Sequence, residues 1–392
     1  MPKLIRITTV PLSLKLLLAG QMKFMKEAGW DVLMVSADGR EINEVRKREG
    51  CEHHVIPFTR KITPFHDLYC LWLLFMLFRK EKPDIVHSHT PKAGLLAMIA
   101  ARLAGVKTKI HTVAGMPYMV AEKNKKKLLI AMEKLTFRWA DEVWPNSFSL
   151  KDFMLQEGLL EETKVRVIGN GSSNGVDLSK FNRNSLAENH LVAATMRITP
   201  SENDFLILAV GRLVRDKGVE ELVEAFLQSK VSKYGKLVLL GSFEQKLNPI
   251  KDDVMRKIQD HPRIVQIEWS DHVAHYLALA DVLVHASHRE GFPNVLLEAG
   301  AMQVPVICSD IIGNVDLITN KETGLVFPVK NAEVLKDALE FAFVKRDYMQ
   351  QLADNLYHKV KSQFDRNDIH HLVLENYTRL VEEEDENEAH QS

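Results

Sequence analysis

Residues 280–308, ADVLVHASHREGFPNVLLEAGAMQVPVIC, are the stretch from which the fold of this chain can be worked out. The first part, residues 281–285, is an apolar run rich in β-branched side chains, as expected of a buried strand. A polar loop with one glycine follows, and residues 294–302 place apolar side chains at helical spacing before a second buried strand at 305–308. The order of strand, loop, helix and strand predicts one unit of a parallel sheet.

Pro293 precedes the helical segment, and proline suits the first turn of a helix because its missing N–H would have no partner there. The free amides of Asn294, Val295 and Leu296 are then expected to point back into the loop. Free amides at the start of a helix form a site for an anion such as phosphate.

Two carboxylates, Glu290 and Glu298, stand on either side of this predicted anion site. A carboxylate beside bound phosphate would be repelled by it, so both side chains are better suited to binding hydroxyl groups. A diphosphate at the helix start, with a hydroxylated ring at each end, is the chemical form of a nucleotide-sugar. A surface glutamate and a helix-face glutamate can also occur in any α/β protein, and their spacing alone does not separate the two interpretations.

The motif Glu290-Gly291-Phe292-Pro293-Asn294, followed by Glu298-Ala299, resembles the two-glutamate signature of the retaining GT-B glycosyltransferases, in the large family called group 1 or GT4. The resemblance extends over nearly the whole chain. It implies an α/β fold of two Rossmann-like, doubly wound parallel-sheet domains that face across a cleft, with a C-terminal helix returning to the first domain. It also implies that Glu290 binds the transferred sugar and Glu298 the ribose, within a donor site that includes Gly291, Phe292 and residues 294–296.

The composition is that of a globular protein. A length of 392 residues predicts two domains, and 46% hydrophobic with 26% charged residues allows an ample core. The cysteines Cys51, Cys70 and Cys308 are scattered among apolar residues, which favours a reducing compartment and neither a disulfide nor a metal cluster. No secretion signal is expected, and the apolar run at 71–78 is too short to span a bilayer. These features favour a cytoplasmic protein.

Short apolar strands alternate with helix-length segments, which predicts parallel sheets with both faces covered. The expected strands of a first domain are residues 4–8, 31–36, 53–57, 84–88, 109–112, 142–144 and 165–168. Those of a second domain are residues 205–210, 236–241, 263–268, 281–285, 305–308 and 324–327. We therefore expect an acceptor-binding domain at 1–185, a nucleotide-sugar-binding domain at 186–365, and a C-terminal helix with an acidic tail at 366–392. Doubly wound domains bind ligands at the carboxyl ends of their strands.

The segment VGRLVRDKG at 210–218 follows the first predicted strand of the second domain. Gly211 allows a tight turn there, and Arg212 and Lys217 could reach one diphosphate from two directions. The pair resembles the arginine and lysine with which the family holds the nucleotide diphosphate. Two exposed cations on a loop are the alternative, but the position directly after the leading strand favours the functional interpretation.

Three histidines lie on predicted strands of the first domain. The family carries a histidine close to the sugar and its phosphate at a position comparable to His111, so the resemblance implies a catalytic role for it. A lone histidine is, however, more often structural. His87 and His89 alternate onto one face of another strand, and because no further ligands join them, a structural role is favoured over a metal site.

Three stretches resemble a narrower branch of the family: HTVAGMPY at 111–118, WPNS at 144–147 and VIGNGSSNGVD at 167–177. That branch adds N-acetylhexosamines, N-acetylgalactosamine among them, to undecaprenyl-diphosphate-linked sugars in bacterial surface glycan assembly. The three glycines of the last stretch also predict a hinge, or a loop that another group approaches closely.

The chain departs from the family after its first strand, where many relatives have a Gly-Gly loop whose backbone approaches the donor phosphate. Residues 10–16, VPLSLKL, contain no glycine. Ser13 and Lys15 are candidates to replace that loop as a phosphate contact, and an acceptor-binding role is the alternative.

The predicted reaction moves a sugar, an N-acetylhexosamine by the branch resemblance, from a nucleotide expected to be UDP to a lipid-linked or glycan acceptor. Negative charge grows on the leaving diphosphate, and the helix amides with Arg212 and Lys217 would stabilise it. We therefore expect neither a metal ion nor a cofactor, and no Asp-x-Asp pattern stands in a suitable loop. The resemblance implies retention by a front-face, oxocarbenium-like route in which a donor phosphate oxygen accepts the proton of the acceptor.

Two other functions fit parts of the sequence. A GT-B-like UDP-sugar 2-epimerase would share both domains and the donor site, but it would need an acid/base pair and no acceptor. A non-enzymatic sugar-binding protein would be expected outside the cytoplasm with a signal peptide, and would not need Arg212, Lys217 and the two glutamates. The sequence does not specify the sugar, the linkage, the acceptor or the oligomeric state.

Charge is distributed unevenly along the chain. Residues 1–185 carry 29 lysines and arginines against 19 aspartates and glutamates, a net charge of +10, whereas the remainder carries −11. A basic half favours an anionic partner for the first domain, although no feature indicates nucleic acid. The acidic residues at 382–388 are expected to form a disordered end.

Residues 123–139 predict where that anionic partner binds. The segment begins with Lys123, Lys125, Lys126 and Lys127 and continues with apolar residues that share one helical face. Those apolar residues are Leu128, Leu129, Met132, Leu135 and Trp139. A core-packed helix with a solvated basic face is the alternative. Because the suspected acceptor is an anionic lipid, we predict a peripheral protein on the inner face of the cytoplasmic membrane.

Overall fold

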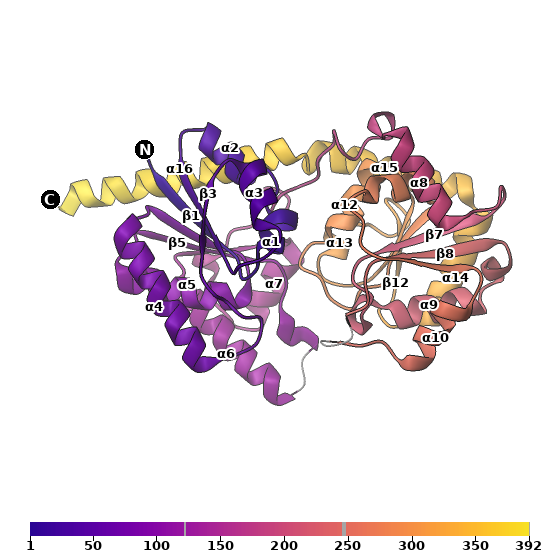
Figure 1. Cartoon of the computed structure of the whole chain (residues 1–392), viewed down its shortest axis with the longest axis horizontal. Helices are drawn as coiled ribbons and strands as arrows, with labels where there is room; N and C mark the ends of the chain where they lie inside the picture. The colour runs from indigo at the N-terminus through magenta and orange to yellow at the C-terminus, as the bar shows by residue number, and fades with distance from the viewer. Residues whose placement is uncertain (121–122, 245–247, 392) are drawn as a thin grey trace. The chain divides into compact units, whose positions relative to one another are not determined.

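The computed structural model describes residues 1–120, 123–244 and 248–391, and the chain divides into two compact units (Figure 1). Unit 1 consists of Met1–Asn174 together with Asn367–Ser392, and unit 2 is Gly175–Arg366. The division falls between residues 174 and 175, whereas the sequence analysis places it between 185 and 186. Residues 175–185 belong to unit 2 because Val176 and Phe181 are buried in its core.

Unit 1 alternates strands and helices. Its strands are β1 (Lys3–Ile7), β2 (Asp31–Ser36), β3 (Glu52–Val55), β4 (Ile85–Ser88), β5 (Thr108–Val113) and β6 (Glu142–Pro145). Its α-helices are α1 (Pro11–Leu17), α2 (Gln21–Glu27), α3 (Ile42–Glu49), α4 (Pro64–Glu81), α5 (Pro91–Ala104), α6 (Lys123–Trp139), α7 (Phe148–Gln156) and α16 (Arg366–Gln391). Every residue of β4 and β5 is buried, as expected for central strands covered on both faces.

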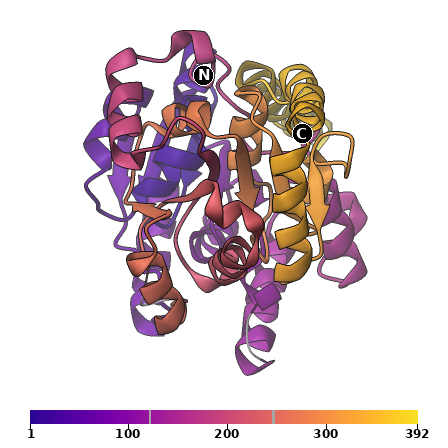
Figure 2. The ribbon, with the colours of Figure 1, turned by 90° about the vertical axis from the view of Figure 1, so that its right-hand side faces the viewer.

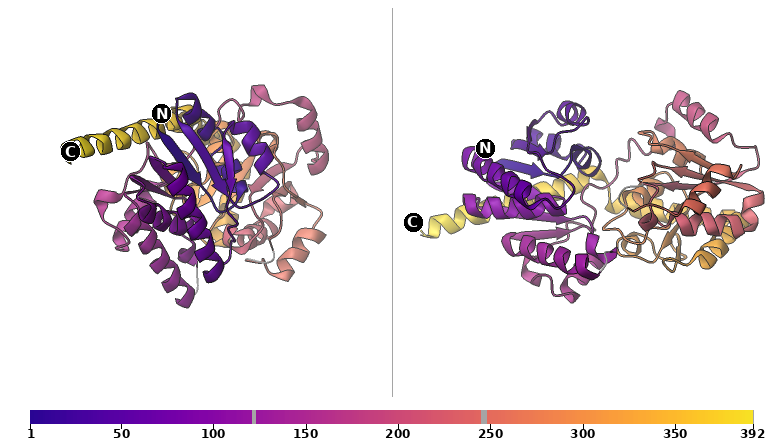
Figure 3. Two further views of the ribbon diagram at one scale, coloured as in Figure 1. Left: turned by 60° about the vertical axis from the view of Figure 1, so that its left-hand side comes forward. Right: turned by 60° about the horizontal axis from the view of Figure 1, so that its bottom comes forward.

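The described strands of unit 1 form one parallel sheet in the order β3-β2-β1-β4-β5-β6. Buried side chains of α1, α2, α3 and α16 pack with strand residues such as Leu4 and Met34 into one core cluster. Helices α4, α5 and α6 connect the strands of the other half and lie side by side, with α5 in contact with both neighbours (Figures 1 and 3). Helices α1, α2, α3 and α16 thus form one group that packs on the sheet, and α4, α5 and α6 form another.

Local sequence signals mark where several helices begin. Proline occupies the first turn of α1, α4 and α5, where its missing N–H has no helical partner. The Ser147 hydroxyl caps α7 by accepting from the Leu150 amide at 3.2 Å. The Asn331 side chain caps a helix of unit 2 by accepting from the Val334 amide at 3.0 Å.

Unit 2 repeats the same architecture (Figure 2). Its strands are β7 (Phe205–Val210), β8 (Gly235–Leu240), β9 (Ile264–Ile267), β10 (Val282–His285), β11 (Val306–Ser309) and β12 (Leu325–Phe327). Its α-helices are α8 (Glu188–Ile198), α9 (Val219–Gln228), α10 (Asp252–Asp260), α11 (Val273–Leu279), α12 (Asn294–Ala301), α13 (Asn314–Leu317), α14 (Ala332–Val344) and α15 (Arg346–Gln363). The stretch at 280–308 is, as predicted, a strand, a loop, a helix and a second strand.

The two sheets share one winding pattern. The sheet of unit 2 has the order β12-β11-β10-β7-β8-β9 among the described residues, which is the order of unit 1 when its strands are counted from β7. In each unit the first and fourth strands are neighbours, β1 beside β4 and β7 beside β10, and the chain proceeds from them toward opposite edges. The carboxyl ends of these paired strands are where doubly wound sheets bind ligands. The predicted α/β class with two doubly wound sheets is confirmed.

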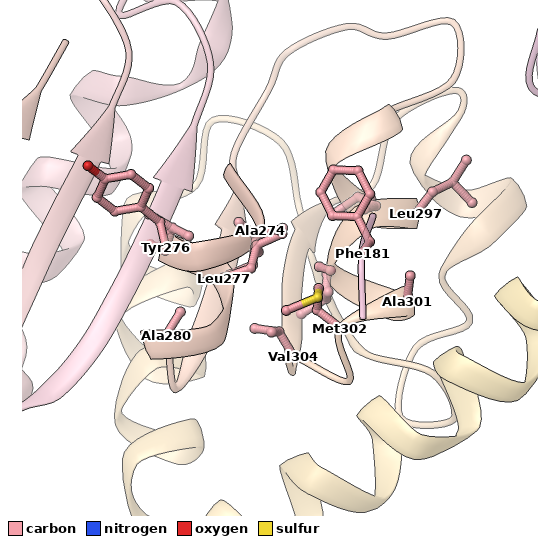
Figure 4. Packing of buried hydrophobic residues seen from close by; sticks show 14 of the residues in the cluster. Phe181, Ala274, Tyr276, Leu277, Ala280, Leu297, Ala301, Met302 and Val304 are labelled. Carbon is pink, nitrogen blue, oxygen red and sulfur yellow. The ribbon is translucent and has the colours of Figure 1, made fainter. Parts of the chain in front are cut away.

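Helix α12, which follows β10, is fixed by a large apolar cluster in unit 2. Leu296, Leu297 and Ala299 are fully buried and pack with residues of α11 and with the strands. Figure 4 shows members of this cluster, among them Leu277 of α11 and Ala301 of α12. Because burial of each such leucine contributes about 1.5–3 kcal/mol, the start of α12 is held firmly at the strand ends.

One predicted strand of the first domain is wrong. Residues 165–168 do not form a strand, and Val165 makes only an isolated bridge to Val143 of β6. The chain turns away directly afterwards, where Gly169 has a left-handed φ of 54°. The apolar β-branched residues at 165–168 have the pattern of a strand, but the turn at Gly169 prevents them from pairing further with the sheet.

The glycine-rich segment at 167–177 lies against the C-terminal part of the chain. The Val176 amide donates to the Phe364 carbonyl at 2.9 Å, and the Arg366 amide donates to the Val176 carbonyl at 3.1 Å. Gly175 has a left-handed φ of 55°, and a Cβ atom there would lie 2.5 Å from the Phe364 oxygen. The group that approaches this segment closely is thus the protein's own backbone, at the two points where the chain crosses between the units.

Helix α16 returns to unit 1, as predicted. Its residues Ile369, Val373, Tyr377 and Leu380 are buried in the unit 1 core. The acidic end was predicted to be disordered, and this is wrong, because α16 runs through residues 382–388 to its end at Gln391. Arg379 and Glu383, which are four residues apart on α16, form an ion pair at 2.9 Å that stabilises this part of the helix.

Candidate active site

The loops that follow β7 and β10 meet through an ion pair between Lys217 and Glu290. Lys217 ends a short 3-10 turn, and Glu290 lies in the loop before α12. The Glu290 carboxylate also accepts from the Ser287 hydroxyl at 2.9 Å and lies 3.3 Å from His285 Nε2. Two residues predicted from separate motifs are thereby brought together at the strand ends of unit 2.

Glu290 stays ionised in this environment. Desolvation acts to raise the pKa of its carboxyl, since its side chain is only 17% exposed, but the Lys217 ammonium and the adjacent His285 outweigh burial and hold the pKa well below its usual range. An ionised carboxylate accepts hydrogen bonds only, so Glu290 is suited to receive hydroxyl donors.

Glu298 lies further along, on α12, in the opposite electrostatic situation. Desolvation raises the pKa of its carboxyl to about 7, while the more distant cations Lys180 and Arg366 oppose the shift. The side chain is partly buried, and no cation forms an ion pair with it among the described residues. The two glutamates of the motif therefore differ in charge state near neutral pH.

The start of α12 offers fewer free amides than the sequence predicts. The Leu296 amide donates to the Pro293 carbonyl at 3.1 Å, so it is not available to an anion. Pro293 is the N-cap residue of α12 and does not lie in its first turn. The Pro293 carbonyl therefore accepts the first hydrogen bond of the helix, from Leu296. The amides of Asn294 and Val295 make no hydrogen bond to the described part of the protein and remain available.

The neighbouring donor-site candidates differ in what they present. The Phe292 side chain is buried and packs against Phe364, with ring centroids 5.3 Å apart, so its side chain serves the core. Gly291 lies against Gly313 at the start of α13, where a Cβ atom would come within 2.7 Å of the Gly291 oxygen. Gly313 has a left-handed φ of 84°, so a side chain at this position would both strain the backbone and push the Gly291 loop away.

Arg212 pairs with a different carboxylate from Lys217. Its guanidinium forms an ion pair with Glu244, in the loop after β8, and its side chain is half exposed. The sequence analysis predicts that Arg212 and Lys217 reach one diphosphate together. In this structure the two cations have different carboxylate partners, so Arg212 would have to exchange Glu244 for a ligand phosphate.

Asp216 and Arg289 also belong to the site, although the sequence did not predict a role for them. Asp216 is buried and pairs with Arg289 at 3.1 Å, and its carbonyl accepts from the His288 amide at 2.8 Å. These contacts fasten the loop after β7 to the loop after β10 and so fix Lys217 opposite Glu290. The sequence signal was available, because Asp216 adjoins Lys217 and Arg289 adjoins Glu290, but their pairing depends on strand order.

His111 lies within β5 and is fully enclosed. Its Nδ1 is 2.8 Å from the Ser88 hydroxyl at the end of β4, and its ring fills the space beside Gly94, where a Cβ atom would lie 2.3 Å away. Burial lowers the pKa of His111 to about 4, so the imidazole is neutral near pH 7. The predicted catalytic role stays a prediction, and in this position His111 would act as a neutral hydrogen-bonding group.

Ser13 and Lys15 lie on helix α1, so the prediction that they belong to a loop after the first strand is wrong. After β1 only residues 8–10 are irregular before Pro11 begins the helix. The Lys15 ammonium pairs with Glu44 at 3.0 Å, so it is engaged within unit 1. The apolar spacing at 10–16 fits a helix turn, and the absence of glycine, noted as a departure from the family, is consistent with it.

His87 and His89 line a small cavity at the strand ends of unit 1. His87 lies between Tyr377 Oη, at 2.5 Å, and Thr112 Oγ1, at 2.7 Å, and its pKa is lowered by burial. The ring of His89 lies 4.1 Å from that of His87. These bonds join α16 to β4 and β5, which is a structural role. No group of three or more metal-ligating side chains with suitable geometry occurs among the residues described here.

Comparison with known proteins assigns the family. A model described as "Glycosyl transferases group 1" matches residues 194–359, and one described as "Glycosyl transferase 4-like domain" matches residues 18–171. The protein named capsular polysaccharide biosynthesis glycosyltransferase CapM, from Staphylococcus aureus, is 34% identical over 92% of this chain and 93% of its own length. The chain belongs to the group 1 glycosyltransferases. It is therefore a glycosyltransferase, and its relative CapM is named for capsular polysaccharide biosynthesis.

Other members of the family are named for their substrates. The Escherichia coli UDP-Gal:alpha-D-GlcNAc-diphosphoundecaprenol alpha-1,3-galactosyltransferase is 30% identical over 71% of both chains. The Campylobacter jejuni N,N'-diacetylbacillosaminyl-diphospho-undecaprenol alpha-1,3-N-acetylgalactosaminyltransferase is 24% identical over 92% of this chain and 94% of its own. Among solved structures, Anabaena HepE in complex with UDP-glucose aligns with a TM-score of 0.80, at 16% identity, over 97% of this chain and all of that one. This likeness confirms the predicted GT-B fold.

Helix α6 does not pack as a simple amphipathic helix would. Its buried positions are Glu133, Thr136 and Phe137, whereas Leu128 and Leu135 of the predicted apolar face are exposed. Lys125, Lys126 and Lys127 are exposed as predicted; the side chain of Lys123 lies outside the described residues. No described helix combines the length and the apolar character needed to cross a bilayer.

Proposed function

We propose that this chain is a retaining, metal-independent glycosyltransferase that moves an N-acetylhexosamine from a UDP-sugar to an undecaprenyl-diphosphate-linked acceptor. The observation that carries the proposal is the meeting of Lys217 and Glu290 at the carboxyl ends of β7 and β10, next to the free amides of α12. Cation, carboxylate and helix start together provide partners for a diphosphate and for the hydroxyls of the attached sugar.

The roles follow from the charge states. Lys217 and the amides of Asn294 and Val295 stabilise the diphosphate as it leaves, and Glu290, ionised, receives hydroxyls of the transferred sugar. Glu298 receives the ribose hydroxyls. As the bond between the anomeric carbon and the diphosphate oxygen breaks, the acceptor oxygen bonds to the same face of that carbon, and its proton passes to a diphosphate oxygen.

The names of relatives support the choice of substrates. The Escherichia coli and Campylobacter jejuni proteins described above are named for diphosphoundecaprenol acceptors, and the former for a UDP-sugar donor. Such an acceptor is anionic and resides in a membrane. The exposed lysines of α6 would contribute about 1 kcal/mol each beside an anionic leaflet, so we propose peripheral attachment to the inner face of the cytoplasmic membrane.

The function is tested first by ligand binding and then by transfer. UDP- and GDP-sugars are screened for protection against thermal unfolding, because a ligand at a hundred times its Kd stabilises the native state by about 2.7 kcal/mol. A protecting UDP-N-acetylhexosamine is then incubated with an undecaprenyl-diphosphate-linked sugar, and the linkage of the product is determined by NMR. An α-linked product from the α-linked donor is expected.

Incubation of the donor without acceptor separates the other candidate functions. Conversion of the donor to its 2-epimer would identify an epimerase. Binding of sugar without conversion, in the presence of every acceptor tested, would identify a sugar-binding protein. A β-linked product would contradict retention while leaving the transferase assignment in place.

A further inference from the structure

Helix α4 of unit 1 is apolar on both its buried and its exposed sides. Its inner face consists of Cys70, Leu74, Leu77 and Phe78, all buried. Its outer face consists of Phe65, Leu68, Tyr69, Trp72 and Met76, all exposed, and we call these five residues the α4 stripe. Phe65 is 91% exposed and Trp72 53% exposed, so the stripe leaves large aromatic surface in contact with water. An exposed apolar patch of this kind marks an interaction surface.

The spacing of the stripe shows that it is one continuous surface. Positions 65, 68, 69, 72 and 76 follow the intervals of three and four residues that place side chains on one side of a helix. Tyr69 and Trp72 stack with ring centroids 6.2 Å apart. A surface helix of a globular protein normally carries polar residues on this side, and here they are replaced over three turns.

The exposed charges of α4 and of Lys61 just before it are positive, although Lys80 also lies 3.5 Å from Glu81. The acidic residues within α4 point to partners in unit 1: Asp67 pairs with Lys92 at 2.5 Å, and Glu81 pairs with Lys3 at 2.7 Å. Lys61, just before the helix, and Arg79 and Lys80, in its last turn, are exposed. Aromatic and apolar side chains flanked by exposed cations, with acids turned inward, are the composition of a helix that lies in a membrane interface.

The neighbouring helices extend this character. Helix α5 contacts both α4 and α6, and the three lie side by side (Figures 1 and 3). The exposed residues of α6 include Leu128, Leu135 and Lys125–Lys127, again apolar and basic. The α4 stripe is therefore part of a helical layer whose exposed residues suit an anionic lipid surface.

We propose that the α4 stripe inserts into the interface of an anionic bilayer, with Lys61, Arg79 and Lys80 at the level of the lipid headgroups. This inference rests on the proposed function, because a lipid-linked acceptor requires the protein to work at a membrane. It goes beyond attachment through α6, since it assigns the apolar contribution to a different helix. A second copy of this chain is a poorer occupant, because a two-fold symmetric contact centred on the stripe would oppose the same cations to each other.

The two helices contribute to binding in different ways that salt can separate. Attraction between the α6 lysines and the leaflet is screened as ionic strength rises, whereas burial of apolar side chains is not. We therefore expect part of the vesicle binding to persist at high salt, and that part to depend on α4.

The test is sedimentation of the intact protein with vesicles of phosphatidylcholine and phosphatidylglycerol, at low and at high salt. The stripe variant carries Phe65→Ser, Leu68→Ser and Trp72→Ser. We expect it to bind at least about a hundredfold more weakly, since each buried side chain of this size contributes about a tenfold factor. A control variant, Met196→Ser with Tyr234→Ser and Trp269→Ser, removes three large exposed apolar residues of unit 2 and should bind as the parent does.

The position of Trp72 gives a second measurement that does not depend on that variant's stability. Fluorescence of the parent should be quenched by lipids brominated on their acyl chains, and most of the quenching should be lost in Trp72→Phe. The matched control Trp269→Phe should keep it. Quenching that is undiminished in Trp72→Phe would overturn the insertion of α4.

Three further outcomes would overturn the inference. These are a parent that never sediments with vesicles, a stripe variant that binds as the parent does, and a parent that dimerises without lipid through contacts that the stripe variant abolishes. Transfer to a water-soluble analogue of the acceptor is measured alongside. If the parent transfers sugar to that analogue but does not bind vesicles, the inference fails while the proposed function stands; if no transfer occurs with any donor, the proposed function itself fails.

Discussion

The strand ends of the two units have the same topology and opposite electrostatics. At the ends of β7 and β10, charged residues are held in pairs: Lys217 with Glu290, and Arg289 with Asp216. At the ends of β1 and β4, the hydroxyls and imidazoles are uncharged near neutral pH, and the buried cation Arg6 lies nearby, within β1. There Thr9 and Thr90 share a hydrogen bond of 2.7 Å between their hydroxyls, and buried His89 has a pKa lowered by burial.

This difference shows how one winding pattern can serve two kinds of ligand. Paired ions can exchange partners with an anionic ligand, so the ends of unit 2 suit a diphosphate. Neutral hydroxyls and imidazoles offer hydrogen bonds without charge, so the ends of unit 1 suit the hydroxyls of a sugar acceptor. The topology fixes where a ligand binds, and the side chains decide which one.

The largest expected effect comes from breaking the central ion pair of unit 2. Glu290→Ala removes the group that contacts the reacting sugar, and we expect kcat to fall by about 10²–10³-fold. The control is Glu224→Ala, which removes an exposed carboxylate that accepts a hydrogen bond from Gln228 of its own helix. Steady-state transfer kinetics measure both, and near-parental turnover of Glu290→Ala would remove the mechanism proposed for this site.

The next effect tests the buried hydrogen-bond network of unit 1, in which the Arg6 guanidinium takes part. Buried Arg6 donates to Tyr377 Oη, and Tyr377→Phe leaves that guanidinium without this acceptor. We expect the free energy of unfolding of unit 1 to fall by about 1–3 kcal/mol, measured by denaturant titration.

Tyr348→Phe is the matched control for this change, because the Tyr348 hydroxyl bonds to the Lys321 carbonyl at an exposed position. It should cost less than about 0.5 kcal/mol. If the two substitutions lowered the free energy of unfolding equally, burial of the Arg6–Tyr377 hydrogen bond would make no difference to its contribution to stability.

A smaller effect separates the two glutamates of unit 2 by pH. The pKa of Glu298 is raised to about 7 by burial, so its carboxyl is largely protonated at pH 6 and ionised at pH 8. Because ribose hydroxyls donate more strongly to the ionised form, the affinity for a UDP-sugar should rise about threefold to tenfold over this range. Titration calorimetry measures it, and the affinity of Glu298→Gln should be flat with pH.

The same pKa makes an opposite prediction for stability. The folded state holds the Glu298 proton more tightly than the unfolded state, so its contribution to stability is present at pH 4.5 and lost as the pH rises through about 7. The difference in free energy of unfolding between the parent and Glu298→Gln should therefore shift against the parent over this interval. A constant difference would show that the carboxyl titrates normally.

The smallest expected effect is none at all. Lys217 and the amides of Asn294 and Val295 are the proposed partners of the diphosphate, so EDTA should leave the transfer rate unchanged. Loss of activity in EDTA that is restored by Mg²⁺ or Mn²⁺ would contradict the metal-independent scheme.

Patterns local in sequence predicted most of the fold. The strand–loop–helix–strand order at 280–308 is confirmed, because buried strands and helix starts carry signals within a few residues. The return of the last helix is also confirmed, but it was implied by the family resemblance and not by a local pattern. The strand at 165–168 failed since nothing nearby shows that a turn at Gly169 ends it. The loop expected around Ser13 failed because it was inferred from relatives, whereas the apolar spacing there is helical.

The site was predicted less completely than the fold. The meeting of Lys217 with Glu290 depends on β7 lying beside β10, and that order is set by packing over the whole sheet. The bonds of Arg212 to Glu244 and of Asp216 to Arg289 are likewise invisible in sequence, as is the opposite shift in the pKa values of two glutamates in one motif. Charge state follows from burial, which only the folded chain defines.

The assignment of α16 to unit 1 has a consequence for how the chain is made. The first strand carries Arg6, whose buried guanidinium is bonded to Tyr377 near the end of the chain, whereas unit 2 is continuous in sequence. A ribosome therefore synthesises all of unit 2 before it reaches the last helix of unit 1. The N-terminal part of the nascent chain must wait with its α16-binding surface uncovered, and its oldest segment can finish folding only after α16 has emerged.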